Sequence, residues 1–173
     1  VGRIALVKRP LLVAKLFLYA LKKDPYVAKN FKLCFAGAGE TLNDLNKFIN
    51  NNNLNKFILP VKKINSSLMP QLYKGSHAVL FLSQSEVNPF VIKEALSSGK
   101  PIFTTNVGTA KNLITKKNGV MVPINNPLKN LDQFIAFLKK KYNSKDIINS
   151  SLNFINNDNK ILNENIKKIY KWS

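Results

Sequence analysis

The sequence is poor in the residues that build cross-links and metal clusters. It has one cysteine, Cys34, and one histidine, His77, among 173 residues. A lone cysteine excludes an internal disulfide and fits a reducing compartment. Cys34 lies in the apolar run 33–36, which predicts a buried, unreactive thiol. The absence of a His cluster and of an Asp-x-Asp sequence gives no indication of a metal site.

Long apolar segments are also lacking. The longest, 11–21, is interrupted by Lys15 and is too short to cross a bilayer. Arg3, Lys8 and Arg9 precede it as basic residues precede a signal-peptide core, but no small-residue cleavage site follows. We therefore expect a buried helix here, and a cytoplasmic protein.

Acidic residues are scarce as well. The chain has 9 Asp and Glu against 27 Lys and Arg, a formal net charge of +18. Such an excess attracts polyanions: nucleic acid, anionic lipid headgroups or phosphorylated ligands. Lysine and asparagine abound throughout, which equally fits a compositional bias with most lysines simply solvated. The hydrophobic fraction of 45% and aromatic fraction of 10% are those of a globular domain.

Short apolar runs alternate with helix-period segments, which predicts successive β–α units and a parallel sheet. The expected strands are 33–36, 57–61, 78–82, 101–104 and 120–122, with residues 1–3 ending a further strand. The expected helices are 10–23, 41–51, 67–74, 89–98 and 128–140, followed by two near 145–156 and 160–172. The predicted fold class is α/β: a Rossmann-like parallel sheet over residues 1–140 with helices on both faces, then C-terminal helices over 141–173.

Small, polar or glycine-bearing loops follow three of the expected strands, at 37–40, 83–88 and 104–108. The carboxyl ends of parallel strands meet at one edge of a sheet, where ligands bind in this class of fold. The loops therefore predict a site for a polar, anionic ligand at that edge.

The segment 86–94 carries the strongest local signal. Asn88 followed by Pro89 predicts a helix N-cap with proline in the first helical position. The amides of Phe90 and Val91 are then unpaired and available to a phosphate. Glu94 lies among apolar residues one turn further on, so its carboxylate needs a partner.

Two interpretations of the glutamates are open. A ribose diol would satisfy both oxygens of Glu94, with Glu86 reaching a second polyol near the phosphates. Alternatively, Glu94 pairs with Lys93 or Lys100, and Glu86 is simply solvated.

These glutamates, with seven residues between them, resemble the pair found in retaining GT-B glycosyltransferases of family four, the "group 1" glycosyltransferases. Further segments resemble the C-terminal domain of that family, in the same order. They are Val1-Gly2-Arg3 with Lys8 to Leu12, then 35–40, 68–73 with 78–83, 95–102, 105–108 and 118–123. The resemblance covers residues 1 to about 127, and its specificity comes from the joint order.

The resemblance implies roles for individual residues. Arg3 and Lys8 would hold the donor diphosphate, Glu94 the ribose hydroxyls, and Glu86, as the catalytic residue, would contact the transferred sugar. Residues 60–63 would lie near the nucleobase, and neither a metal nor a cofactor is implied. The implied donor-binding residues are Gly2, Arg3, Lys8, Gly37, Asn88, Phe90, Val91 and Glu94.

Three positions depart from the family pattern. Asn88-Pro89 stands where Phe-Gly is common, Thr109 where a second glycine is usual, and Lys62 where a glycine usually precedes the turn at the base. Because of these departures, the resemblance does not identify the donor sugar.

The resemblance implies that the chain binds the donor, a UDP- or GDP-hexose, in a retaining glycosyltransferase. The acceptors of that enzyme would be lipid-linked or cell-surface glycans. Because the first residue is not Met, we expect a fragment that lacks an N-terminal acceptor domain and is inactive alone. The C-terminal helices, with Tyr170 and Trp172, would contact that domain. The net charge suits peripheral docking on the anionic inner face of a membrane.

Two alternatives belong to other classes. A basic nucleic-acid-binding module would use the charge alone, but the lysines are scattered and no binding motif appears, so nucleic acid is not an expected partner. An epimerase or phosphorylase would keep the GT-B fold and change the reaction.

Overall fold

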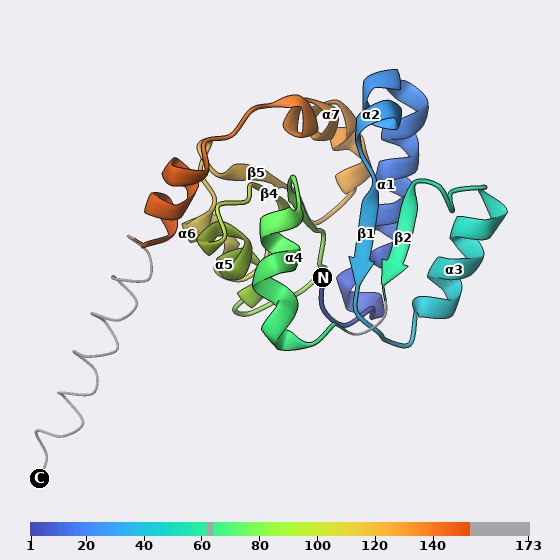
Figure 1. Cartoon of the computed structure of the whole chain (residues 1–173), viewed down its shortest axis with the longest axis horizontal. Coiled ribbons are helices and arrows are strands. Elements are labelled where there is room, and N and C mark those ends of the chain that lie inside the picture. The colour runs from blue at the N-terminus through green and yellow to red at the C-terminus, as the bar shows by residue number, and fades with distance from the viewer. Residues whose placement is uncertain (62–63, 153–173) are drawn as a thin grey trace, which may run out of the picture.

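The computed structural model describes residues 1–61 and 64–152 of the chain (Figure 1). In chain order the elements are η1 (Leu6–Lys8), α1 (Pro10–Lys23), α2 (Pro25–Asn30), β1 (Leu33–Ala36), α3 (Leu42–Asn51), β2 (Ile58–Val61), η2 (Ser66–Leu68), α4 (Met69–Gly75), β3 (Val79–Phe81), α5 (Phe90–Ser97), β4 (Ile102–Thr105), α6 (Ala110–Leu113), β5 (Gly119–Val122), η3 (Pro127–Asn130) and α7 (Leu131–Lys139). Residues 144–152 are also helical. Lys62, Lys63 and the predicted helix near 160–172, with Tyr170 and Trp172, lie outside the described residues.

All the strand pairs run parallel, as the alternation of apolar runs and helices predicts. β1 pairs with β2, and β3, β4 and β5 pair in that order. The α/β class and the parallel pairing are confirmed, but the strands form two sheets and not one. Residues 1–3 were expected to end a strand, and they are not in a strand. They lie between β1 and the other half of the molecule, where Figure 1 places the N-terminus.

Helices cover both faces of the β3–β5 sheet because successive residues of β4 point to opposite sides. Ile102 packs with Ile92 and Leu96 of α5. Phe103 packs on the opposite side, with its ring 5.2 Å from that of Phe134 in α7. Figure 1 shows α4 and α5 in front of this sheet. Both β4 side chains are fully buried, so the core continues through the sheet.

The longest apolar segment forms helix α1, with the bounds that the sequence predicts. Arg9 precedes it in the left-handed region (φ 53°), and Pro10 takes the first helical position, where a missing N–H costs nothing. Leu16, Phe17 and Ala20 are buried, and α1 packs against α3 and α7. The segment is a core helix, as expected. No helix in residues 1–61 or 64–152 is both long and apolar enough to cross a membrane.

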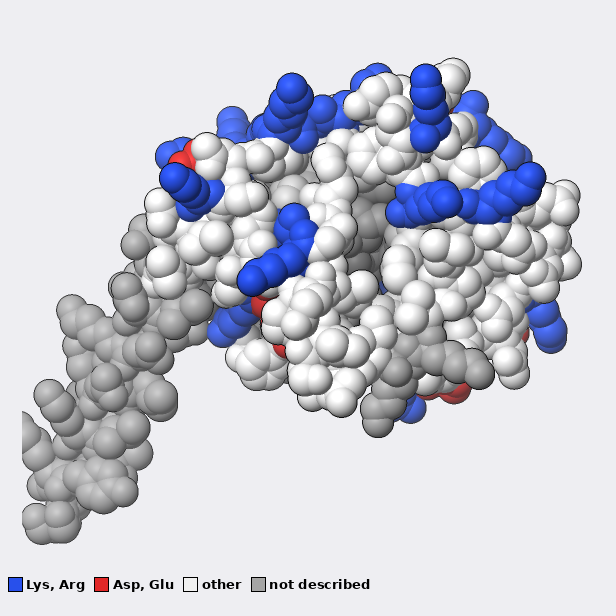
Figure 2. Space-filling model, in the orientation of Figure 1, with Lys and Arg blue, Asp and Glu red and all other residues white. Residues whose placement is uncertain are grey.

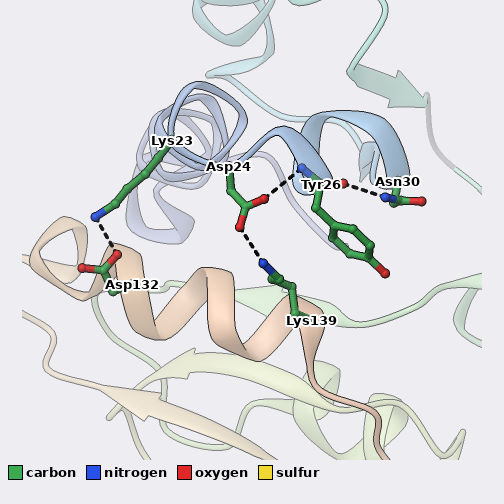
Figure 3. A network of polar contacts seen from close by, with 6 residues as sticks. All are labelled: Lys23, Asp24, Tyr26, Asn30, Asp132 and Lys139. Carbon is green, nitrogen blue, oxygen red and sulfur yellow. Dashed lines mark hydrogen bonds and ion pairs between the residues drawn. The ribbon is translucent and has the colours of Figure 1, made fainter.

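A polar network ties the end of α1 to α7 (Figure 3). Asp24 caps α2 by accepting a hydrogen bond from the Tyr26 amide at 2.8 Å, and its other oxygen accepts from Lys139 Nζ at 2.9 Å. Lys23 pairs with Asp132 at 2.6 Å. Helix α2 was not predicted, although Asp24-Pro25 is a helix-start signal of the same kind as Asn88-Pro89.

The Asp24 carboxylate gives a pH-dependent prediction. The hydrogen bond from Lys139, with a smaller contribution from the Tyr26 amide, lowers the pKa of Asp24 below its usual value. A carboxyl whose pKa is lower in the folded state stabilises that state above its unfolded pKa, and this contribution is lost as the pH falls through the folded pKa. Asp24→Asn keeps a capping oxygen but removes the charge, so it should lower Tm at pH 7 and not at pH 2.

Thermal unfolding at the two pH values checks this, with exposed Asp44→Asn on α3 as the control. Equal losses of Tm at pH 7 and pH 2 would contradict a contribution from the charge.

Candidate functional site

The loops that follow β1, β3 and β4 meet with the N-terminal segment, as the predicted edge requires. The Gly2 amide donates to the Ala36 carbonyl at 2.9 Å, beside Gly37. The Gln84 amide donates to the Val7 carbonyl at 2.8 Å, and the Thr109 amide to that of Val87 at 3.3 Å. Residues far apart in the sequence therefore share one edge of the parallel strands.

Lys8 and Glu86 form an ion pair in this site. Lys8 ends the turn η1, and Glu86 lies on the loop after β3, with 29% and 20% of their side chains exposed, respectively. Lys8 Nζ also lies 5.2 Å from the centre of the Phe81 ring, and burial lowers the pKa of Lys8. The interpretation of Glu86 as a merely solvated carboxylate is therefore wrong.

Glu94 has a partner that neither interpretation named. Tyr73 on α4 donates its hydroxyl to Glu94 Oε2 at 2.6 Å. Tyr73 is buried, and burial together with this contact raises its pKa. No hydrogen bond from the described part of the chain reaches Glu94 Oε1, and Glu94 is exposed. One oxygen is thus held and the other is open to a ligand, whereas the ribose interpretation left both oxygens to the ligand and the other paired Glu94 with a lysine.

Helix α5 begins one residue later than predicted. Its N-cap is Pro89 (φ −74°, ψ 93°), not Asn88, and the Pro89 carbonyl accepts from the Ile92 amide at 3.0 Å. The φ of proline suits a cap as well as a first turn, which explains the shift. No carbonyl among the described residues accepts from the Phe90 or Val91 amide. Asn88 is exposed, and so is Phe90, at 66%.

Arg3 lies at the rim, where its Nε is 3.2 Å from Glu40 Oε2. The two side chains are 74% and 51% exposed, so the pair is weak and easily replaced. Gly37 makes the closest backbone contact in the site: an added Cβ would lie 1.9 Å from the Gly2 carbonyl oxygen. Its φ of +148° is also unfavourable for any other residue. The structure therefore holds Gly2 against the loop after β1.

Gly108 gives a prediction on the same principle. It has a φ of +49°, and an added Cβ would lie 2.3 Å from the carbonyl oxygens of both Glu86 and Val87. Gly108→Ala should therefore displace the Glu86 loop and destabilise the fold by about 1–3 kcal/mol. Gly75→Ala is the matched control, because an added Cβ there meets no atom within 4 Å. Urea unfolding measures both, and equal stabilities would contradict the close approach.

Metal binding has no obvious location in the described part of the chain. No three His, Cys, Asp or Glu side chains gather there in a way that would hold an ion. His77 is not in such a group: its ring lies against Phe31, with Nε2 3.0 Å from the Leu138 carbonyl oxygen. Independence of a metal stays a prediction.

The fold and the site define an α/β domain of parallel strands whose carboxyl ends carry a cation, a carboxylate and free helix amides. The chain belongs to the family "Glycosyl transferases group 1", whose sequence model matches residues 1–161. This match confirms the resemblance to the family. The similar solved structures described next confirm the predicted fold, which is that of the C-terminal domain of GT-B proteins. No curated protein matches the sequence.

Solved structures share the fold at low sequence identity. The pneumococcal O-GlcNAc transferase in complex with UDP and GlcNAc aligns with a TM-score of 0.77 at 18% identity, over 98% of this chain and 34% of that one. Sucrose-phosphate synthase from Thermosynechococcus elongatus aligns at 0.75 and 18%, over 100% and 45%. The C-terminal domain of a group 1 glycosyl transferase from Francisella tularensis aligns at 0.66 and 22%, over 87% and 77%. The chain thus spans about a third to a half of the first two proteins.

Proposed function

We propose that this chain binds a nucleotide diphosphate sugar, a UDP- or GDP-hexose, as the donor half of a retaining glycosyltransferase. The observation that carries the proposal is the set of groups at one edge. Lys8, the open amides of Phe90 and Val91, and the free oxygen of Glu94 offer contacts to phosphate and ribose. The neighbouring structures with UDP and GlcNAc, or with UDP and glucose, make UDP the first nucleotide to test.

Each group would contribute in a definite way. Lys8, Arg3 and the amides at the start of α5 stabilise the diphosphate as it leaves, so the reaction needs no metal ion. Glu94, oriented by Tyr73, accepts hydrogen bonds from the ribose hydroxyls. Glu86 faces the transferred sugar, and Gly2, Gly37 and Asn88 let the backbone approach the donor. A nucleobase would lie near 60–63, which lies partly outside the described residues.

Transfer would need more than this domain. An N-terminal domain would bind the acceptor, a lipid-linked or cell-surface glycan, and close over the donor to exclude water. Residues 141–173 would contact that domain. Figure 2 shows that Lys and Arg greatly outnumber Asp and Glu on the visible face, which suits the peripheral docking of a cytoplasmic protein on an anionic membrane.

Calorimetric titration with UDP, GDP, UDP-hexoses and GDP-mannose tests the donor site. Binding of one nucleotide, weakened by Arg3→Ala and by Glu94→Ala and unchanged by a chelator, is expected. If none binds to this chain or to a longer protein that contains it, the proposal fails. Steeply salt-dependent binding of oligonucleotides without competition from nucleotides would instead favour a nucleic-acid module.

A further inference from the structure

The edge of the strands opposite the candidate site is rich in lysine. We call it the amino edge, because the amino ends of parallel strands meet there with the carboxyl ends of the helices that connect them. Lys32, Lys56 and Lys117 lie in the connections that lead into β1, β2 and β5, respectively. Lys22 and Lys29 lie near the ends of α1 and α2. All five side chains are exposed.

Charge is unevenly divided between the two edges. Two carboxylates near the amino edge are already engaged, since Asp24 pairs with Lys139 and Asp132 with Lys23. Within residues 1–61 and 64–152, no ion pair involves any of the five lysines named above. Figure 2 shows Lys and Arg along the upper edge, over the positions of α2 and α7 in Figure 1, and most of the visible Asp and Glu lower on this face. The amino edge is therefore a positively charged surface with little internal neutralisation.

The stabilisation of helix ends explains only part of this surface. A lysine in the last turn of a helix interacts favourably with the helix dipole, which accounts for Lys22 and Lys29. Lys56 and Lys117 lie in turns well beyond the ends of α3 and α6, and Lys32 lies outside α2. The charges at these three positions are therefore available to a partner outside the domain.

The kind of cation favours a lipid surface over a nucleic acid. Arginine makes the planar, bidentate contacts that are typical of base and phosphate recognition. The two arginines of the chain, Arg3 and Arg9, both lie at the carboxyl edge, where Arg3 contacts Glu40 and Arg9 donates to the Ile124 carbonyl. The amino edge presents lysines, which are hydrated point charges that suit a diffuse layer of anionic headgroups.

An exposed aromatic side chain lies among these lysines. Tyr26 on α2 is 50% exposed, and Lys139 Nζ lies 5.4 Å from the centre of its ring, within the network of Figure 3. Tyrosine is enriched where a membrane meets water, because its ring is apolar and its hydroxyl stays hydrated. Lysine behaves similarly, with an apolar stem and a charged end. The composition of the amino edge thus matches the headgroup region of a bilayer.

We propose that the amino edge is the surface by which this domain docks on a bilayer of anionic lipids, with Tyr26 at the level of the headgroups. The proposal rests on the peripheral docking put forward under the proposed function, and it adds the surface, the lipid charge and the orientation. The candidate donor site, at the opposite edge, would face away from the bilayer. A nucleotide could then enter and leave while the protein stays bound, and a lipid-linked acceptor would need a glycan long enough to reach that edge.

Sedimentation with vesicles measures the docking, without any nucleotide present. The whole chain should bind vesicles of phosphatidylglycerol mixed with phosphatidylcholine, and not vesicles of phosphatidylcholine alone. One variant combines Lys32→Gln, Lys56→Gln and Lys117→Gln, which removes three charges from exposed positions. Each lysine near an anionic surface contributes about fivefold in affinity, so the partition coefficient should fall by roughly a hundredfold.

The matched control combines Lys15→Gln, Lys111→Gln and Lys129→Gln. It removes the same charge from exposed lysines of α1, α6 and η3 that lie outside the amino edge. Its partition coefficient should stay within about threefold of the unchanged chain, because only long-range attraction is reduced. Equal losses for the two variants would show that overall charge and not this surface binds the lipid, and the proposal would be wrong. Absence of vesicle binding by the unchanged chain would also overturn it, while donor binding is judged separately by calorimetry.

Two further measurements test the orientation and the kind of partner. Mixed vesicles should slow acetylation of Lys32, Lys56 and Lys117 by at least about fivefold, as followed by mass spectrometry, and should leave Lys111 and Lys129 unchanged. Slower acetylation of Lys111 and Lys129 instead would contradict the orientation. A DNA duplex of mixed sequence, supplied at the same concentration of negative charge as the lipid, is the competing polyanion. If it abolishes vesicle binding at physiological salt, the amino edge is a nucleic-acid surface and the proposal fails.

Discussion

Glu94→Ala is expected to weaken binding of the donor nucleotide by on the order of a hundredfold, the largest effect of any single change at the site. A hydrogen bond to a charged group contributes about 1.5–3 kcal/mol, and the substitution removes the charged acceptor completely. The rest of the site should persist, because Glu94 is exposed and lies on a helix whose buried face is formed by Ile92, Ala95 and Leu96. Because the buried Tyr73 hydroxyl also loses its acceptor, a loss of stability of about 1–3 kcal/mol should accompany the loss of affinity.

Tyr73→Phe tests whether the orientation of the Glu94 carboxylate matters for binding, in addition to its presence. It removes the 2.6 Å hydrogen bond but keeps the carboxylate and the ring, so a smaller loss of affinity is expected, roughly three- to tenfold. Calorimetry with the nucleotide that binds best measures both variants, with exposed Asp44→Ala as the control. If Glu94→Ala bound as tightly as the control, the assignment of Glu94 to the ribose would be wrong, even if the nucleotide still bound.

Phe103→Ala is expected to cost about 3–5 kcal/mol of the free energy of unfolding, a large share of the total for a domain of this size. Phe103 is fully buried in β4, and its ring lies 5.2 Å and 5.5 Å from the rings of Phe134 and Phe137. Its loss would open a cavity between the sheet and α7, whose helix position is fixed by the same contacts.

Phe90→Ala removes the same side chain where it is 66% exposed, so its cost should stay within about 0.5 kcal/mol. Urea unfolding followed by circular dichroism measures both variants. Comparable losses for Phe103→Ala and Phe90→Ala would show that the contact between sheet and α7 contributes little to stability.

The parts of the fold that could be predicted have a strong local pattern. Segment 33–36 is a strand and 10–23 a helix with the predicted bounds, because a continuous apolar run and a proline start mark them. The short helices α2 and α6 were missed because six and four residues are too few to show a helical period. Cys34 was expected to be buried, and it is exposed, because its burial depends on what lies beside β1 and not on the apolar run itself.

The site shows a similar division. The three loops at one edge followed from the order of strands, and the open amides of α5 followed from its proline start, despite the error of one residue in the cap. The pairs Lys8–Glu86 and Tyr73–Glu94 join different elements, and no local pattern indicates that they touch. The buried Tyr73, two residues before the end of α4, had no sequence signal that distinguished it from a core residue.

The ion pair of Lys8 with Glu86 has a consequence for how the site responds to salt. Lys8 already has the Glu86 carboxylate beside it, so an incoming diphosphate exchanges one counter-charge for another. Fewer small ions are displaced from the protein in such an exchange than in the neutralisation of a bare cation. The affinity for nucleotide should therefore fall only gently between low and physiological salt, whatever the net charge of +18 does to encounters at long range. The overall charge would then govern the association rate of the nucleotide. The Lys8–Glu86 pair would govern the electrostatic part of its binding free energy.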